Sequence, residues 1–267
     1  DVAGAMKGSG RSSFNGTVSL QYTYNNLIFN NQTTITTNKA TESKYGSFSD
    51  YARMQPYWRT HDADGNLIKS YDGISTEVFG NPLHNASLNT YDISKYTEFV
   101  NNFSIEWNIV DQLRLRGQLG ISKRFDTNDA FYPAEHTRFE DYEIIDANKK
   151  GQYDYSDGEA FSLDGNITLS WAKTVADKHN FYVGADASFS NRESHNYIFS
   201  AVGFPNESLD FIGSSLGYPS GLKPISDEYK SRNVGFTANA NYSYDNRYFI
   251  DASFRYDGSS LFGGNKR

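Results

Sequence analysis

The sequence lacks cysteine, long apolar runs and a basic charge balance. Without cysteine, neither a disulfide framework nor a cysteine-ligated zinc site is possible. No apolar run approaches the roughly 20 residues that a membrane-spanning helix needs. The formal net charge is −7 at pH 7, which argues against a nucleic-acid partner. Residues 1–11 also lack the apolar segment of a secretory signal peptide.

Aromatic residues are abundant although the chain is polar overall. Hydrophobic residues make up 37% of the sequence and aromatic residues 16%, with 20 Tyr and 19 Phe. This composition is typical of outer-membrane β-barrels. Large soluble β-proteins share it, so the arrangement of the residues has to decide between the two classes.

Apolar and polar residues alternate along eight segments, which predicts eight strands in four hairpins. Side chains of a strand point to opposite faces in turn, so each strand has one apolar and one polar face. In the last hairpin, residues 233–259, pairing across Asn246 places Tyr244 opposite Tyr248. The other predicted turns lie at residues 25–26, around Asp111 and at residues 175–178.

The predicted connections are short at one end of the hairpins and long at the other. The strands are expected to run about 11 to 15 residues, enough for a tilted membrane crossing. Long loops are expected at residues 41–95, 126–158 and 191–230. Short periplasmic turns and long extracellular loops characterise outer-membrane barrels. The predicted fold is therefore all-β, an antiparallel transmembrane β-barrel segment.

Aromatic side chains gather at both ends of the predicted apolar faces, with smaller or aliphatic residues between them. Aromatic rings favour the two membrane–water boundaries, whereas a soluble core has little reason to sort them by height. The pattern favours lipid on this face over the core of a β-sandwich. The predicted lipid-facing girdles consist of Tyr22, Tyr24, Trp107, Trp171, Phe181, Tyr244 and Tyr248 beside the turns, and of Phe14, Phe103, Phe161, Phe189, Phe236 and Tyr256 at the far ends.

Charged residues of the predicted strands fall on the opposite face. A Lys or Arg facing lipid at mid-depth would cost roughly 2–4 kcal/mol, so the absence of charge from the apolar faces agrees with lipid there. The residues expected to face the lumen are Glu106, Arg116, Asp164, Asp186, Asp251 and Arg255.

Two stretches resemble a known family. Residues 242–267, YSYDNRYFIDASFRYDGSSLFGGNKR, closely resemble a signature of SusC-like (SusC/RagA-type) TonB-dependent transporters. In that signature a Y-x-Y-x-x-R-Y turn leads into a strand ending in R-x-D-G-S-S-x-F-G. Residues 42–72 resemble the long loop of the same family, in which a YGSF segment precedes a Pro-Tyr pair and a D-x-x-G-N turn.

The resemblance implies a barrel of about 22 strands. Residues 1–267 would form a middle part of this barrel domain, with the plug domain and the TonB box absent from the chain. The family imports oligosaccharides, or in some members peptides, across the outer membrane of Gram-negative bacteria. Its implied partners are the TonB complex, a SusD-like lipoprotein lid and outer-membrane lipid. No cofactor is implied.

Aromatic residues in the predicted loops are candidate contacts for a ligand or a partner protein. Sugar rings stack on Trp or Tyr, and an exposed apolar patch suits a partner surface. The alternative is that these side chains pack the loops themselves. The candidates are Tyr57, Trp58 and Arg59 in the longest loop and Phe199, Phe204 and Phe211 in the third.

Neither a metal site nor an enzyme is expected. Residues 62–66, DADGN, predict a β-turn, because the glycine falls one position early for a calcium loop and position 12 is not Glu. The five histidines lack metal-binding spacing and are expected at solvated positions. No nucleophile motif accompanies the acidic residues at 135–143.

Other hypotheses stay open at this point. A passive porin or a surface-binding barrel would share the strand pattern, and a plug domain upstream would distinguish an energised importer from both. A soluble β-sandwich would stay monodisperse without detergent. Within the family, the sequence does not distinguish an oligosaccharide from a peptide as the ligand.

Overall fold

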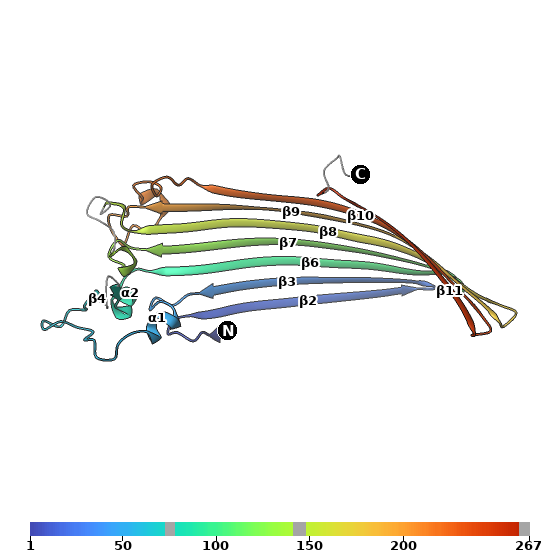
Figure 1. Cartoon of the computed structure of the whole chain (residues 1–267), viewed down its shortest axis with the longest axis horizontal. Helices are drawn as coiled ribbons and strands as arrows, with labels where there is room; N and C mark the ends of the chain where they lie inside the picture. The colour runs from blue at the N-terminus through green and yellow to red at the C-terminus, as the bar shows by residue number, and fades with distance from the viewer. Residues whose placement is uncertain (73–77, 141–147, 262–267) are drawn as a thin grey trace.

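The computed structural model describes residues 1–72, 78–140 and 148–261. Within these residues, nine strands form one antiparallel sheet in the order β1-β2-β3-β6-β7-β8-β9-β10-β11. Figure 1 shows the strands side by side in a curved wall, with short turns at one end and loops at the other. The strands are β1 (Val2–Ala3), β2 (Gly10–Tyr24), β3 (Leu27–Thr41), β6 (Tyr91–Val110), β7 (Leu113–Tyr132), β8 (Gln152–Val175), β9 (His179–Val202), β10 (Ile225–Tyr244) and β11 (Tyr248–Ser259).

The four predicted hairpins are confirmed, and so is the register predicted for the last one. Tyr244 pairs with Tyr248 across the last turn, and Trp107 pairs with Leu115 in the second hairpin. Asparagine and aspartate hold the left-handed backbone conformation at the first and last turns, with φ of 49° at Asn25 and 53° at Asn246. These residue types tolerate positive φ better than others, which explains why the turn positions could be found in the sequence.

Strands β2, β3 and β11 have the predicted length of 11 to 15 residues, whereas β6 to β10 are longer, and the expected limits of the loops are wrong. Strands β8 and β9 have 24 residues each. Strand β9 continues to Val202 and β10 begins at Ile225, so much of the loop expected at residues 191–230 is sheet. The backbone ladder continues where the apolar alternation has ended, for example where Glu193 pairs with Lys230.

Short elements fill the loop end of the sheet. They are α1 (Phe48–Ala52), α2 (Pro82–Ser87), the two-stranded ladder of β4 (Ser70–Asp72) and β5 (Val78–Gly80), and the 3-10 turns η1 (Thr137–Phe139) and η3 (Ile212–Ser214). Among the residues described, every helix is too short or too polar to traverse a bilayer.

The small apolar core also lies at the loop end. Phe131, Ala201 and Phe204 are buried together, with Tyr91 and Tyr153 packed against them. Backbone hydrogen bonds from Gly203 to Gly151 and from Phe204 to Lys150 hold the loop after β9 over this cluster. The middle of the sheet has no such cover within the described residues, and large apolar side chains there stay exposed.

Candidate functional site

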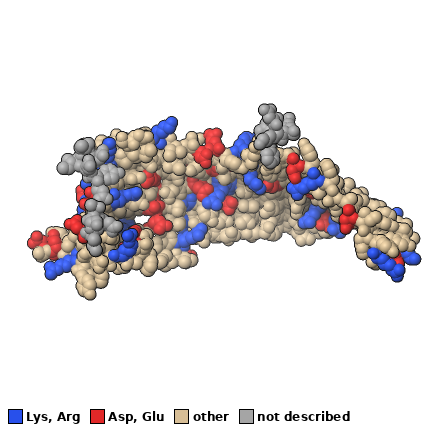
Figure 2. All heavy atoms as spheres, viewed as in Figure 1, with Lys and Arg blue, Asp and Glu red and all other residues tan. Residues whose placement is uncertain are grey.

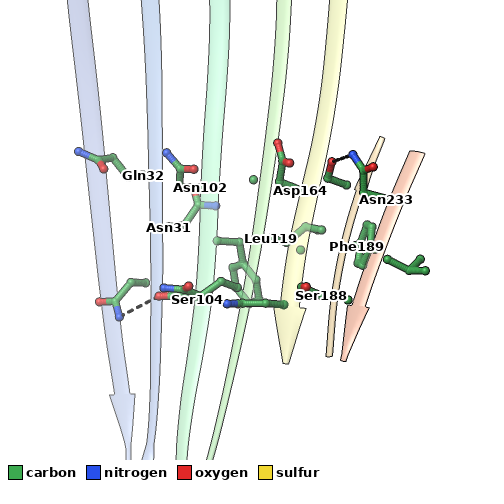
Figure 3. Close-up of a pocket in the computed structure, with 18 of the residues that line it drawn as sticks. Asn31, Gln32, Asn102, Ser104, Leu119, Asp164, Ser188, Phe189 and Asn233 are labelled. Atoms are coloured by element: carbon green, nitrogen blue, oxygen red, sulfur yellow. Dashed lines mark hydrogen bonds between the residues drawn. The ribbon is translucent and has the colours of Figure 1, made fainter. Parts of the chain in front are cut away.

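One face of the sheet, the polar face, is hollowed, and many of the residues that line the hollow are Ser, Asn or Gln. The hollow has a volume of about 1190 Å³. Cross-strand pairing aligns Gln32 with Asn102, and Asp164 with Ser190. Figure 3 shows Gln32, Asn102, Asp164 and Asn233 at one level of the wall and Ser104 and Ser188 at the next. The complete upper row is Ser19, Gln32, Asn102, Gly120, Asp164, Ser190, Asn233 and Ser259.

A level with more charge follows on the polar face toward the turns. Glu106 is opposite Arg116 in the neighbouring strand, but its ion pair is with Arg114, at 3.5 Å from Nε to Oε1. Thr168 donates a hydrogen bond to Asp186 at 2.8 Å, and Arg255 donates one to Asp257 at 2.6 Å. By strand alternation, the six charges expected at the lumen, Glu106, Arg116, Asp164, Asp186, Asp251 and Arg255, all lie on this face.

The opposite face, the apolar face, carries the aromatic residues expected at the lipid boundaries. They form cross-strand ring contacts, such as Phe181 with Tyr242 at 5.0 Å and Tyr22 with Phe29 at 6.3 Å. Between the aromatic ends lie exposed aliphatic side chains, among them Val18 and Ile167. Charged side chains on this face lie beyond the aliphatic band: Lys173 is near the turns, and Lys123 and Glu159 form an ion pair nearer the loop end. On the side shown in Figure 2, acidic and basic side chains are interspersed rather than gathered by sign.

A second hollow, the mouth pocket, lies at the loop end and has a volume of about 750 Å³. It is lined by residues from three segments, 42–54, 78–92 and 132–140. The Arg138 guanidinium lies 4.1 Å from the centre of the Tyr132 ring, and that of Arg53 lies 5.9 Å from the Phe79 ring. The Tyr132 hydroxyl donates a 3.3 Å hydrogen bond to Asp92. The pocket therefore combines aromatic walls with exposed charge of both signs.

Two asparagines that the sequence analysis did not single out hold the loops of the mouth pocket together. The Asn81 side chain is fully buried and donates to the carbonyls of Thr60 (3.1 Å) and Ile68 (2.7 Å). Its oxygen accepts from the Leu83 amide and caps α2. Asn85 donates to Thr137 at 2.8 Å. The Asn81-Pro82 pair is an N-cap followed by Pro at the first helical position, which is the signal that would have found α2.

Charges and burial around the mouth pocket perturb several titrating groups. Lys69 contacts Glu135 at 3.0 Å and Glu140 at 2.9 Å. Burial opposes the charge on Lys69, but the two carboxylates outweigh it and raise the pKa of Lys69. The hydrogen bond from Lys69 lowers the pKa of Glu135. Burial, and secondly Arg138, lowers the pKa of His136 to about 4, so this histidine is neutral and packed rather than solvated as expected.

Of the candidate ligand contacts in the first loop, one aromatic side chain is packed within the loop and the other is exposed to solvent. Trp58 stacks on Tyr71 at 4.7 Å with the rings 10° from parallel, and it also contacts Phe79 at 5.3 Å. The Tyr71 hydroxyl donates to the Arg59 carbonyl. Tyr57 is 93% exposed. One face of Trp58 is thus covered, while Tyr57 is free for an external contact.

The candidates of the third loop lie in three different environments. Phe199 is in strand β9 and contacts the Tyr155 ring at 6.5 Å. Phe204 is buried in the apolar core, 5.2 Å from Phe131. Phe211 is exposed. The DADGN run forms a turn in which Asp62 accepts hydrogen bonds from the amides of Asp64 and Asn66, as predicted.

Long amphipathic strands, ordered by sequence and joined by short turns at one end, define a segment of an antiparallel β-barrel. No protein-family model matches the chain. All of the chain aligns with the "TonB-dependent receptor P39" of Formosa agariphila, at 26% identity over 272 residues, which is 24% of that protein. The chain thus spans about a quarter of the length of its curated relative.

Solved structures agree on the fold. The RagAB peptide transporter matches 97% of the chain with a TM-score of 0.75 and 17% identity, over 29% of the solved chain. The RagAB peptide importer in its "closed-closed" and "open-open" states gives TM-scores of 0.74 at the same identity and coverage of the chain. The predicted likeness to TonB-dependent outer-membrane transporters is confirmed. As expected, the relatives are a receptor and transporters, not enzymes.

Proposed function

We propose that the chain forms part of the wall and mouth of an energy-dependent outer-membrane nutrient importer. The polar face lines the lumen, and the apolar face with its aromatic girdles contacts lipid. The exposed aliphatic band between two aromatic levels supports this orientation, because such a face is stable only against an apolar surrounding. The likeness to a TonB-dependent receptor supports coupling to energy.

The partners follow from the same likeness. We expect the extracellular loops to meet a SusD-like lipoprotein lid, for which the exposed side chains of Phe211 and Leu216 offer apolar contact area. We expect contact with the TonB complex through a plug domain and a TonB box outside these 267 residues.

The ligand class is inferred from two arginines in the mouth pocket. Among the described residues, no carboxylate lies within ion-pair distance of Arg53 or Arg138, although both line the pocket. Guanidinium groups bind carboxylates through charge-assisted hydrogen bonds. The nearby ring faces are less suited to sugars, since Arg138 covers Tyr132 and Tyr71 covers Trp58. We therefore propose a peptide as the imported ligand, with its carboxylates held by these arginines.

An oligosaccharide remains the second candidate. The amide and hydroxyl rows of the polar face, including Gln32, Asn102 and Asn233, offer donors and acceptors to sugar hydroxyls. The two candidates differ at the mouth pocket, because a neutral oligosaccharide has no group that needs the arginines.

The experiment measures ligand binding to the full-length receptor by calorimetry. The probes are an oligopeptide with a free C-terminus, the same peptide amidated, and a neutral malto-oligosaccharide. Arg53→Gln and Arg138→Gln should each weaken peptide binding about tenfold or more, since a hydrogen bond to a charged group contributes about 1.5–3 kcal/mol. Arg247→Gln, in the turn at the opposite end of the sheet, is the matched control. Tight binding of the neutral oligosaccharide, unaffected by both variants, would refute the peptide proposal.

A further inference from the structure

Two lysines face each other on the apolar side of the sheet near its loop end. Lys39 of β3 pairs directly with Lys95 of β6. Strand alternation places Lys39 on the same face as Ile35, and Lys95 on the same face as Phe99. Both of these apolar side chains are exposed in the band that is proposed to contact lipid.

This lysine pair has no anionic partner in the chain. Side chains directly opposite each other in an antiparallel pair have Cβ atoms about 4.5–5.5 Å apart, and like charges there repel. Within residues 1–72, 78–140 and 148–261, no acidic side chain forms an ion pair with Lys39 or Lys95. Both side chains are exposed. Their charge therefore has to be balanced from outside the chain.

Other basic residues at the loop end of the same face are balanced internally. Lys123 is paired with Glu159. Lys230 contacts Glu193 at 2.6 Å, and Arg232 contacts the same carboxylate at 3.9 Å. The lysine pair lacks such a carboxylate, which makes the other cations suitable controls.

The surroundings of the lysine pair fit a phosphate group. In the same cross-strand row, Ser12 pairs with Lys39 and Thr127 pairs with Lys95. In the next row toward the turns, Thr37 pairs with Thr97. Residues with hydroxyl groups thus occupy the same cross-strand row as the two lysines and the next row, and hydroxyls can donate hydrogen bonds to phosphate oxygens.

The height of the pair points to a lipid rather than a dissolved anion. Lys95 is four residues beyond Phe99, which corresponds to ~13 Å along a strand and ~9 Å along the normal of a membrane crossed at ~45°. Lysine side chains reach back toward the interface from such positions. Acyl chains would then run down over Phe14, Ile35 and Phe99, which are exposed on this face.

We propose that Lys39 and Lys95 bind the phosphate of an anionic lipid headgroup in the outer leaflet. The site rests on the proposed membrane orientation, but it does not depend on which ligand the receptor imports. The lysines supply the charge, the threonines and Ser12 supply hydrogen bonds, and the apolar band below holds the acyl chains.

The test uses the full-length receptor in phosphatidylcholine nanodiscs containing a minor fraction of diphosphoryl lipid A. The readout is the amount of lipid A that stays bound to the protein, measured by native mass spectrometry. The double variant Lys39→Gln/Lys95→Gln should retain about 30-fold less, because each lysine near an anionic surface contributes about 1 kcal/mol. Lys230→Gln, which removes an ion-paired lysine, should retain the wild-type amount.

Three results would overturn the proposal. The first is equal lipid retention by the double variant and the wild type. The second is displacement of lipid A by inorganic phosphate at equal concentration, which would indicate a site for a dissolved anion. The third is association of wild-type receptors through this face, abolished by the double variant, which would indicate a protein partner. Peptide binding at the mouth pocket, measured on the same samples, tests the proposed function separately.

Discussion

Arginine introduced at Ile167 tests whether the apolar face meets lipid. Ile167 is 60% exposed on that face and lies between the small cross-strand neighbours Gly117 and Ala187. It sits between the aromatic levels of Phe161 and Trp171, ten residues apart in β8. Ten residues span ~33 Å along a strand, or ~23 Å along the normal at a tilt of ~45°, close to the ~25 Å apolar band of outer-membrane barrels.

The expected cost of Ile167→Arg is about 2–4 kcal/mol, because the site is ~9 Å inside the nearer aromatic level. Val175→Arg, on the same face beyond Trp171, should cost about 0–1 kcal/mol. Asn166→Arg, on the polar face between Gln118 and Ser188, should change the stability by less than about 0.5 kcal/mol.

The assay is urea unfolding of the full-length receptor in lipid vesicles, followed by tryptophan fluorescence. Three variants at two depths and on two faces are needed. A protein core would also be destabilised by arginine, but the loss of unfolding free energy would not depend on the depth of the residue in the membrane. The reasoning is refuted if Ile167→Arg costs no more than Val175→Arg. It is also refuted if Ile167→Arg and Asn166→Arg lower the unfolding free energy by the same amount.

Three further predictions concern packing, backbone and pH. A Cβ at Gly165 would lie 2.5 Å from Cε1 of Phe189, so Gly165→Ala should lower the unfolding free energy by about 1–3 kcal/mol in urea titrations; unchanged stability would contradict the packing. Ala176 has φ of +51°, so Ala176→Gly should raise the stability by about 1 kcal/mol in the same assay, and a loss would contradict this. The pKa of His136 is lowered to about 4 by burial, so its neutral form stabilises the loop fully above its ordinary pKa of about 6.5. That stability should be lost as the pH falls from 6.5 to 4, seen as faster hydrogen exchange at residues 133–140; the same pH dependence in His136→Gln would contradict it.

The hairpins could be predicted because each strand repeats one simple signal. Alternation with a period of two sets the faces, and a one-residue slip would reverse them, so the pairing of Tyr244 with Tyr248 followed from the turn. Asn25 and Asn246 marked turn positions where the backbone needs positive φ. The alternation is present in all four hairpins, whereas positive φ occurs in the turns of the first, third and last.

The strand ends could not be predicted from the same signal. Beyond the apolar band, Glu159, Glu193 and Lys230 occupy positions that point away from the polar face, so the alternation disappears although the ladder continues. The ion pairs that stabilise these positions join different strands, as between Lys230 and Glu193. Such pairs become visible only when the register of neighbouring strands is known.

The mouth pocket could not be predicted from the sequence either, because its contacts join segments that are distant in the chain. Lys69 meets Glu135, 66 residues away, and Asn85 meets Thr137. Trp58 was singled out for its residue type, but its stacking on Tyr71 depends on the fold of the loop. Neither composition nor spacing indicates that Arg53 and Arg138 share one hollow.

The extension of the strands past the apolar band places the mouth pocket on a sheet rather than on free loops. Asp92 and Tyr132, which line it, belong to the ends of β6 and β7 and are joined by a hydrogen bond. On the other face of the same strand ends, Phe131 packs in the apolar core under the loop after β9. The Asn89 side chain, next to β6, donates to Glu207 and Asp210 of that loop. The ends of β6 and β7 therefore carry residues of the mouth pocket on one face and packing contacts of the loop after β9 on the other, so the strand extension gives both features one rigid support.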